Sequence, residues 1–110
     1  MFRSAVTVDL SGGIDRPRLE ALRSALRLRP EGRLEDGWDE ILGRRVDEVP
    51  GGRIQILLYR ADDPGPWAFH VNVDGDPAAD ALRAVQDELV AAARANGMAV
   101  AGVSHRSTPA

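Results

Sequence analysis

The amino-acid sequence predicts an α+β domain in which a four-stranded antiparallel sheet carries its helices on one face. Three observations predict this class: apolar and polar residues alternate in three short segments and a fourth is short and apolar, apolar residues recur at helical spacing in others, and these segments follow a particular order. The chain has 110 residues, which is enough for one compact core and short for two domains. We therefore expect one domain over residues 1–105 and a flexible tail over residues 106–110.

The first expected strand covers residues 2–10. Apolar and polar residues alternate there, which places the apolar side chains on one buried face. A Ser-Gly-Gly run ends this strand. A helix is then expected over residues 16–28, because leucines recur at helical spacing and Asp15 is a suitable N-cap.

Residues 38–49 are predicted as a second, shorter helix capped by Asp36. Apolar residues recur in this segment at intervals of three and four. Trp38 begins the apolar stripe and is expected in the core. Gly43 weakens a helix by about 1 kcal/mol relative to alanine, so a hairpin arm through residues 45–49 stays open as an alternative.

Two further strands are expected over residues 53–59 and 67–73. Both alternate apolar with polar residues, and Trp67 continues the apolar set of its strand into the core. The residues between them, 61–66, include two aspartates, two prolines and a glycine, which favour a turn. The two strands should therefore form an antiparallel hairpin.

The last helix is expected to begin at Pro77, with Asp76 as its cap. Leucine, valine and alanine side chains form an apolar stripe along this segment, which Asn96 and Gly97 close. Residues 98–105 are short, apolar and bounded by turn residues, so they are predicted as the final strand.

The elements thus follow the order strand, helix, short helix, strand, strand, helix, strand. This is the split β-α-β-β-α-β pattern, whose first and third strands are central when the crossovers are right-handed. The predicted architecture is a ferredoxin-like sandwich with an additional short helix after the first helix. One face of its sheet, the open face, has no cover within the chain. Alternation assigns these residues to it: Thr7, Asp9, Gln55, Leu57, Tyr59, His70, Asn72 and His105.

The open face supplies the candidate residues for binding a ligand or partner, which are Asp9, Leu57, Tyr59, His70 and Asn72. Asp9 and His70 are expected on adjacent strands, where a carboxylate could orient an imidazole for general-base work. The alternative, which we favour, is a polar face covered by solvent or by a subunit, and we predict no catalytic residue. Leu57 and Tyr59 are apolar on an uncovered face, which favours a subunit or ligand contact.

No metal site and no cofactor are predicted. The chain lacks cysteine, which excludes zinc sites built on thiolates. His70, Asn72 and Asp74 alternate along one strand, but residues 74–77 already have a role in ending that strand and starting a helix. The Ser-Gly-Gly run lies between a strand and a helix but lacks the other residues of a phosphate-binding loop.

The charges are unevenly distributed. The net charge of −3 argues against a nucleic-acid-binding module. Residues 15–33 carry six arginines against three acids, whereas residues 35–48 carry six acids against two arginines. The basic segment is either a docking surface for an anionic partner or, as we favour, a solvated ladder of spaced charges.

The sequence shows no apolar run of the length that a signal peptide or a membrane span needs. We therefore expect a soluble cytoplasmic protein without membrane or nucleic-acid partners.

The leading functional hypothesis is a non-enzymatic interaction or regulatory module, for example an antidote-like protein that neutralises a protein partner. We expect it to form a homodimer through the open face. The alternative is a small homodimeric enzyme or ligand-binding protein with its pocket on that face. In outline the architecture resembles dimeric α+β-barrel proteins, some of which are cofactor-free oxygenases or cyclases, but this resemblance implies no catalytic residue here.

Overall fold

The computed structural model of the chain describes residues 1–61 and 66–105. These residues form two helices, α1 (Arg16–Ala25) and α2 (Ala79–Ala95). They also form six strands: β1 (Arg3–Ser11), β2 (Arg29–Pro30), β3 (Ile41–Val49), β4 (Gly52–Arg60), β5 (Trp67–Gly75) and β6 (Ala99–His105). The turn expected at 61–66 lies largely outside the described residues, and the tail over 106–110 lies wholly outside them.

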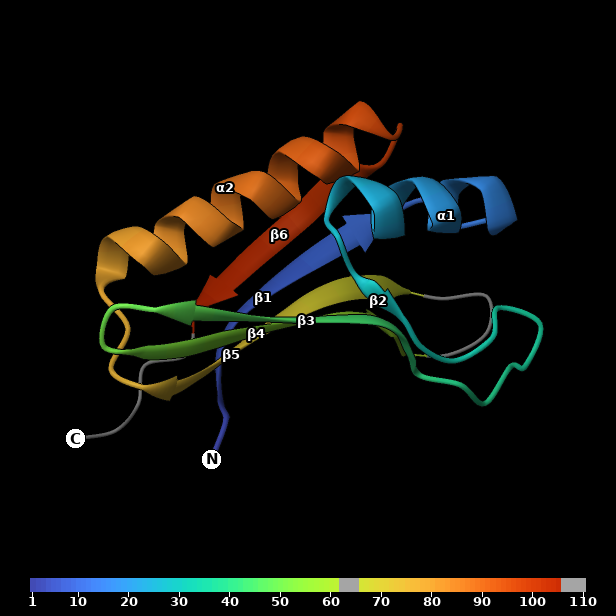
Figure 1. Cartoon of the computed structure of the whole chain (residues 1–110). Coiled ribbons are helices and arrows are strands. Elements are labelled where there is room, and N and C mark those ends of the chain that lie inside the picture. Colours follow the sequence, from blue (N-terminus) through green and yellow to red (C-terminus); the bar gives the residue numbers. More distant parts are fainter. Residues whose placement is uncertain (62–65, 106–110) are drawn as a thin grey trace.

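The strands form one antiparallel sheet in the order β2-β3-β4-β5-β1-β6. Both helices lie on the same face of this sheet (Figure 1). The described residues therefore form a small α+β fold with one face covered by helices and one open face. Neither of these helices is long and apolar enough to cross a membrane.

The prediction of a four-stranded ferredoxin-like sandwich is wrong. The four strands indicated by the sequence do lie side by side, as β4-β5-β1-β6, but the two-residue β2 and the long β3 continue the sheet beyond β4. The additional short helix expected over residues 38–49 is not among the described elements, because most of that segment forms β3.

β3 is a strand because a tight turn folds it back onto β4. Val49 pairs with Gly52, so only Pro50 and Gly51 make the turn. Gly51 has a φ of 92°, and a type II turn requires a positive φ at its third residue and often has proline at its second. The hairpin arm left open for residues 45–49 is thus formed, and it extends back to Ile41.

The hydrophobic core lies between the helices and the covered face of the sheet. Cross-strand pairs such as Val8 with Phe69 and Leu10 with Trp67 place buried side chains directly opposite each other. The helices add the buried residues Leu19, Leu22, Val85 and Leu89 from their inner faces.

The start of α1 agrees with the sequence, and the start of α2 does not. The Asp15 side chain accepts a hydrogen bond of 3.0 Å from the Arg18 amide, as an N-cap does. In α2 the N-cap is Ala78, which makes no side-chain cap. Asp76 does not cap this helix. Its amide donates to the Gly51 carbonyl at 2.9 Å, which holds Asp76 against the β3–β4 turn, and α2 begins at Ala79.

Both helices end in the same backbone motif. The residue after each C-cap has a positive φ, which is 54° at Arg27 and 78° at Gly97. The amide of the following residue, Leu28 or Met98, then donates to a carbonyl of the last turn, at 2.8 Å and 3.0 Å respectively. This is the Schellman motif, so α1 ends at Ala25 and not at the expected residue 28.

A buried arginine holds the segment between β2 and β3 in place. Arg60 is 1% exposed, and its guanidinium donates to the carbonyls of Leu34, Asp36 and Asp39 at 2.8–3.1 Å. Trp38 lies within this segment and is 80% exposed. The prediction that Trp38 belongs to the core is therefore wrong, because no helix forms here to turn it inward.

We predict that the two tryptophans differ sharply in their contributions to stability. Trp67 is 1% exposed, so Trp67→Ala should lower the free energy of unfolding by about 3–5 kcal/mol, with Trp67→Phe as a milder variant if the first does not fold. Trp38→Ala should change it by less than about 0.5 kcal/mol. Urea unfolding of the variants measures both effects, and a large loss from Trp38→Ala would contradict the exposed position.

Candidate functional site

The candidate site is the open face of the sheet. Side chains alternate along each strand, so the residues between the core positions of β1, β4 and β5 face away from the helices. These include all five candidate binding residues: Asp9, Leu57, Tyr59, His70 and Asn72. Asp9 is exposed, and the other four are half-buried among their neighbours.

An aromatic pair lies near the middle of the open face. The pairing register sets Thr7 of β1, His70 of β5, Leu57 of β4 and Arg44 of β3 in one cross-strand row. The ring of Tyr59 lies over His70 with 4.4 Å between ring centroids and 30° between their planes. Contacts between rings at this distance are worth about 0.5–1.5 kcal/mol beyond burial, so the two rings hold each other in position.

The next row of the face is polar, and its side chains bond to each other. Asn72 lies opposite Gln55, and its amide donates to the Gln55 carbonyl oxygen at 2.9 Å. Gln55 is only 9% exposed although no helix covers it. Val46 lies opposite Gln55 on β3 and is 43% exposed, which adds an apolar side chain to the row.

Asp9 does not face His70 directly. Its partners in the register are Ala68 on β5 and Gly102 on β6, whereas Thr7 is opposite His70. Asp9 and His70 are therefore diagonal neighbours on adjacent strands. The register thus lacks the direct opposition that would best suit a carboxylate orienting an imidazole.

His105 lies on the covered side of the sheet and not on the open face. It pairs with Val6, whose side chain is in the core, and it lines a cavity with Leu82 of α2. The pairing of β1 with β6 shifts between Gly102 and Val100, so one residue of β6 is extra. This bulge reverses the alternation that assigned His105 to the open face.

An ion pair joins the start of β4 to the end of β5, beside the β3–β4 turn. The Arg53 guanidinium donates to Asp74 at 2.5 Å and 3.2 Å. This hydrogen bonding, with a further bond from the Met1 amino group, lowers the pKa of Asp74 from 3.8 to about 2. Asp74 thus joins the end of β5 to the start of β4 and to the N-terminus. Among the described residues, no three acidic, histidine or cysteine side chains lie close enough together to hold a metal ion.

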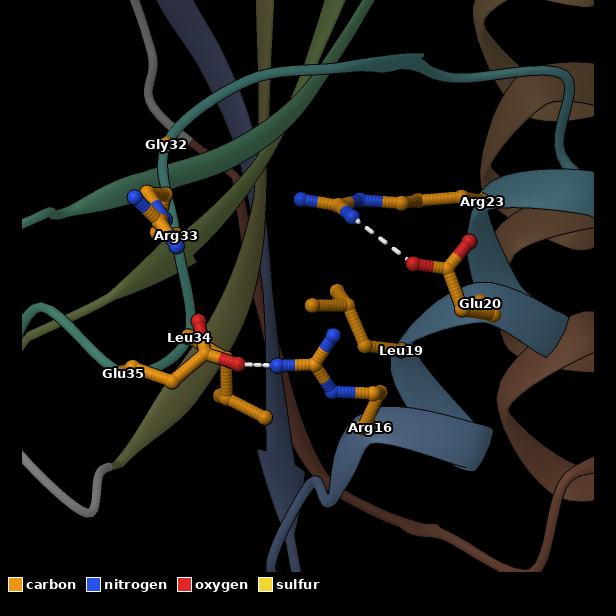
Figure 2. A pocket seen from close by; sticks show the side chains of 8 residues that line it. All are labelled: Arg16, Leu19, Glu20, Arg23, Gly32, Arg33, Leu34 and Glu35. Carbon is orange, nitrogen blue, oxygen red and sulfur yellow. Dashed lines mark hydrogen bonds and ion pairs between the residues drawn. The ribbon is translucent and has the colours of Figure 1, made fainter.

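A small cavity on the helix side is less suited to binding. It measures about 150 Å³ and lies between α1 and the segment that follows β2. Figure 2 shows Arg16 reaching across it to Glu35 and Arg23 pairing with Glu20 on the same helix. Four of the five charged side chains that line the cavity thus pair with one another, which leaves little for a ligand. Of the expected ladder of spaced charges only the Arg23–Glu20 pair lies within α1 in the described part of the chain, because Arg16 pairs with Glu35 outside the helix and Arg23 also donates to the carbonyls of Leu42 and Glu31.

Two surface features were missed by sequence reasoning. Trp38 is a large aromatic side chain on a fixed, solvent-exposed segment, and such residues are common anchors at protein interfaces. The Gly37-Trp38 step amid acidic residues was the available signal, since glycine and alternating acids fit a surface loop better than a helix. The second feature is an arginine-lined cavity beside β2, which forms only when β3 joins the sheet.

No family model matches this chain, and neither a curated protein nor a solved structure matches it. The functional inference therefore depends on the residues and their geometry.

We predict that the Arg53–Asp74 pair gives the protein a specific acid sensitivity. A lowered carboxyl pKa stabilises the fold above the ordinary value of 3.8, and this contribution is lost as the pH falls toward 2. The stability difference between the native chain and Asp74→Asn should therefore narrow as the pH falls from about 4 to 2. Urea unfolding across this range measures it, with Asp87→Asn on exposed α2 as the control. A difference that stays constant would contradict the pair.

Proposed function

We propose that this chain is a small interaction module that binds a protein surface through its open face, and that a second copy of the chain is the first occupant. The observation that supports this proposal is an uncovered sheet face that combines Leu57, Tyr59 and Val46 with polar side chains. Leaving these apolar groups in water forgoes the free energy of their burial, which a partner surface would recover.

The polar groups of the face are compatible with such burial. Covering a polar side chain is costly when its hydrogen bonds are lost. Asn72 and Gln55 already bond to each other, so a partner can cover them without leaving that donor and acceptor unpaired. The Tyr59–His70 contact supplies a preformed aromatic anchor, which reduces the entropy lost on binding.

A two-fold contact suits this face because most soluble homo-oligomers are closed dimers in which the same surface meets itself. A partner-neutralising role would use the same surface, with the homodimer as its resting form. Asp9 is exposed beside the aromatic pair and would lie at the rim of the contact.

A ligand pocket enclosed between two copies is the second candidate function. The contact between His70 and Tyr59 favours it, because these rings bring a titratable group and a phenol together on the face that the second copy would close. In this case the dimer would bind small apolar molecules that the monomer does not retain.

We predict that Leu57→Arg combined with Tyr59→Arg dissociates the dimer. The substitutions place like charges in the mated surface, while the helices on the opposite face keep their packing. Sedimentation should show a dimer for the native chain and a monomer for the variant, with unchanged helical circular dichroism. Ala84→Arg with Ala91→Arg on the exposed side of α2 is the matched control and should remain dimeric.

Three results would count against this proposal. If the native chain sediments as a monomer, the proposed homodimer is wrong. If the double variant sediments as a dimer, the contact between the copies lies elsewhere. Loss of helical signal in the double variant would show that Leu57 and Tyr59 support the fold and not an interface.

A further inference from the structure

A cavity lined by arginines lies where β2 ends beside β3. Its volume is about 360 Å³, and its lining consists of Arg27, Arg29, Arg44, Arg45 and Val46. This volume falls within the range of roughly 300–1,000 Å³ that small-molecule sites occupy. Four arginines thus line one cavity in a chain whose net charge is −3, with Arg45 on the covered side of β3 and Arg44 on its open-face side.

The carboxylates near this cavity are already engaged. Arg45 donates to both carboxylate oxygens of Glu88 and to both of Asp47, at 2.8–3.1 Å. The pKa of Glu88 is lowered, first by these hydrogen bonds from Arg45. Arg44 binds Glu31 at 3.1 Å and 3.3 Å. These contacts fix Arg44 and Arg45 in place.

The other two arginines have no such partner. Within the described residues, neither Arg27 nor Arg29 makes an ion pair or a side-chain hydrogen bond, and both are exposed. Four arginines face three engaged carboxylates, so positive charge remains in excess at the cavity. Arg27 also lies close enough to Glu88 to help lower the pKa of that carboxyl. Neither Arg27 nor Arg29 donates a side-chain hydrogen bond within the described residues, so both guanidinium groups can donate to an anion.

Arg27 also occupies a backbone position that favours glycine. Its φ is 54°, at the site in the α1 Schellman motif where α2 has Gly97. A residue with a Cβ is strained at positive φ, and glycine relieves that strain. At this backbone position α2 thus has glycine, whereas α1 has a charged residue that lines the cavity.

We propose that this cavity is a binding site for the phosphoryl group of a small molecule, with Arg27 and Arg29 as the groups that bind it. A phosphate monoester carries a charge of about −2 at neutral pH, and Arg27 and Arg29 can both donate hydrogen bonds to its oxygens. The planar guanidinium fork binds phosphate oxygens in pairs, which a point charge cannot do. Arg44 and Arg45 line the site, but their carboxylate partners neutralise them, so Arg27 and Arg29 supply its positive charge. The cavity shares Val46 with the open face, but Arg27 and Arg29 are not among the residues proposed for the interface.

Inorganic pyrophosphate is the probe, titrated calorimetrically into the native chain at constant ionic strength. Arg27→Gly and Arg29→Gln should each weaken binding by roughly tenfold or more, as expected for the loss of charge-assisted hydrogen bonds. Arg83→Gln on exposed α2 removes the same charge elsewhere and should leave binding unchanged. Arg27→Gly should also melt at the same or a higher temperature, because glycine suits this position.

Several outcomes would overturn the proposal. One is the absence of pyrophosphate binding by the native chain, and another is equal weakening by Arg83→Gln, which would indicate a general charge effect. A lower melting temperature for Arg27→Gly would show that Arg27 is retained for structure. Tighter binding of citrate or of a DNA oligonucleotide than of pyrophosphate would assign the site to another class of anion. Arg27→Gly, which changes a residue just after α1, should remain dimeric in sedimentation, which separates this test from that of the interface.

Discussion

The pairing of β3 with β4 is the interaction on which the rest of the structure depends. It is closed by the Pro50–Gly51 turn, whose Gly51 carbonyl accepts from the Asp76 amide and so joins the turn to the start of the α2 connection. Gly52 permits this join, because a Cβ there would lie 2.1 Å from the Asp74 carbonyl oxygen. A side chain at this point would force the turn and β5 apart.

The pairing of β3 with β4 also places Arg45 between the sheet and the helices. Arg45 faces the covered side of β3, and its guanidinium donates to the Leu26 carbonyl at the end of α1 at 2.6 Å as well as to Glu88 of α2. One side chain thus joins β3 to both helices. The buried charge of Arg45 is tolerated because its hydrogen bonds are satisfied. Removal of one of its partners would leave buried charge without full compensation.

Sequence patterns predicted the strands that alternate cleanly and failed where burial does not follow hydrophobicity. The buried residues of β3 are Leu42, Gly43 and Arg45, whereas Val46 is 43% exposed. A bulge between Ile41 and Gly43 also breaks the alternation, and the remaining apolar spacing resembles that of a helix. The open face was predicted well where β1, β4 and β5 are regular, and His105 was misplaced by the bulge in β6. The arginine-lined cavity needs contacts across β2, β3 and α1, which no local pattern encodes.

The position of β1 has a consequence for folding during synthesis. β1 lies between β5 and β6, so both of its partners come from much later in the chain. The β3–β4–β5 meander uses short-range pairings and can form soon after its residues leave the ribosome. β1 must wait for β5 on one edge and for residues 99–105 on the other. Until β6 arrives, the nascent domain exposes an unpaired strand edge beside its core, which is the interval in which it is most prone to aggregate or to need a chaperone.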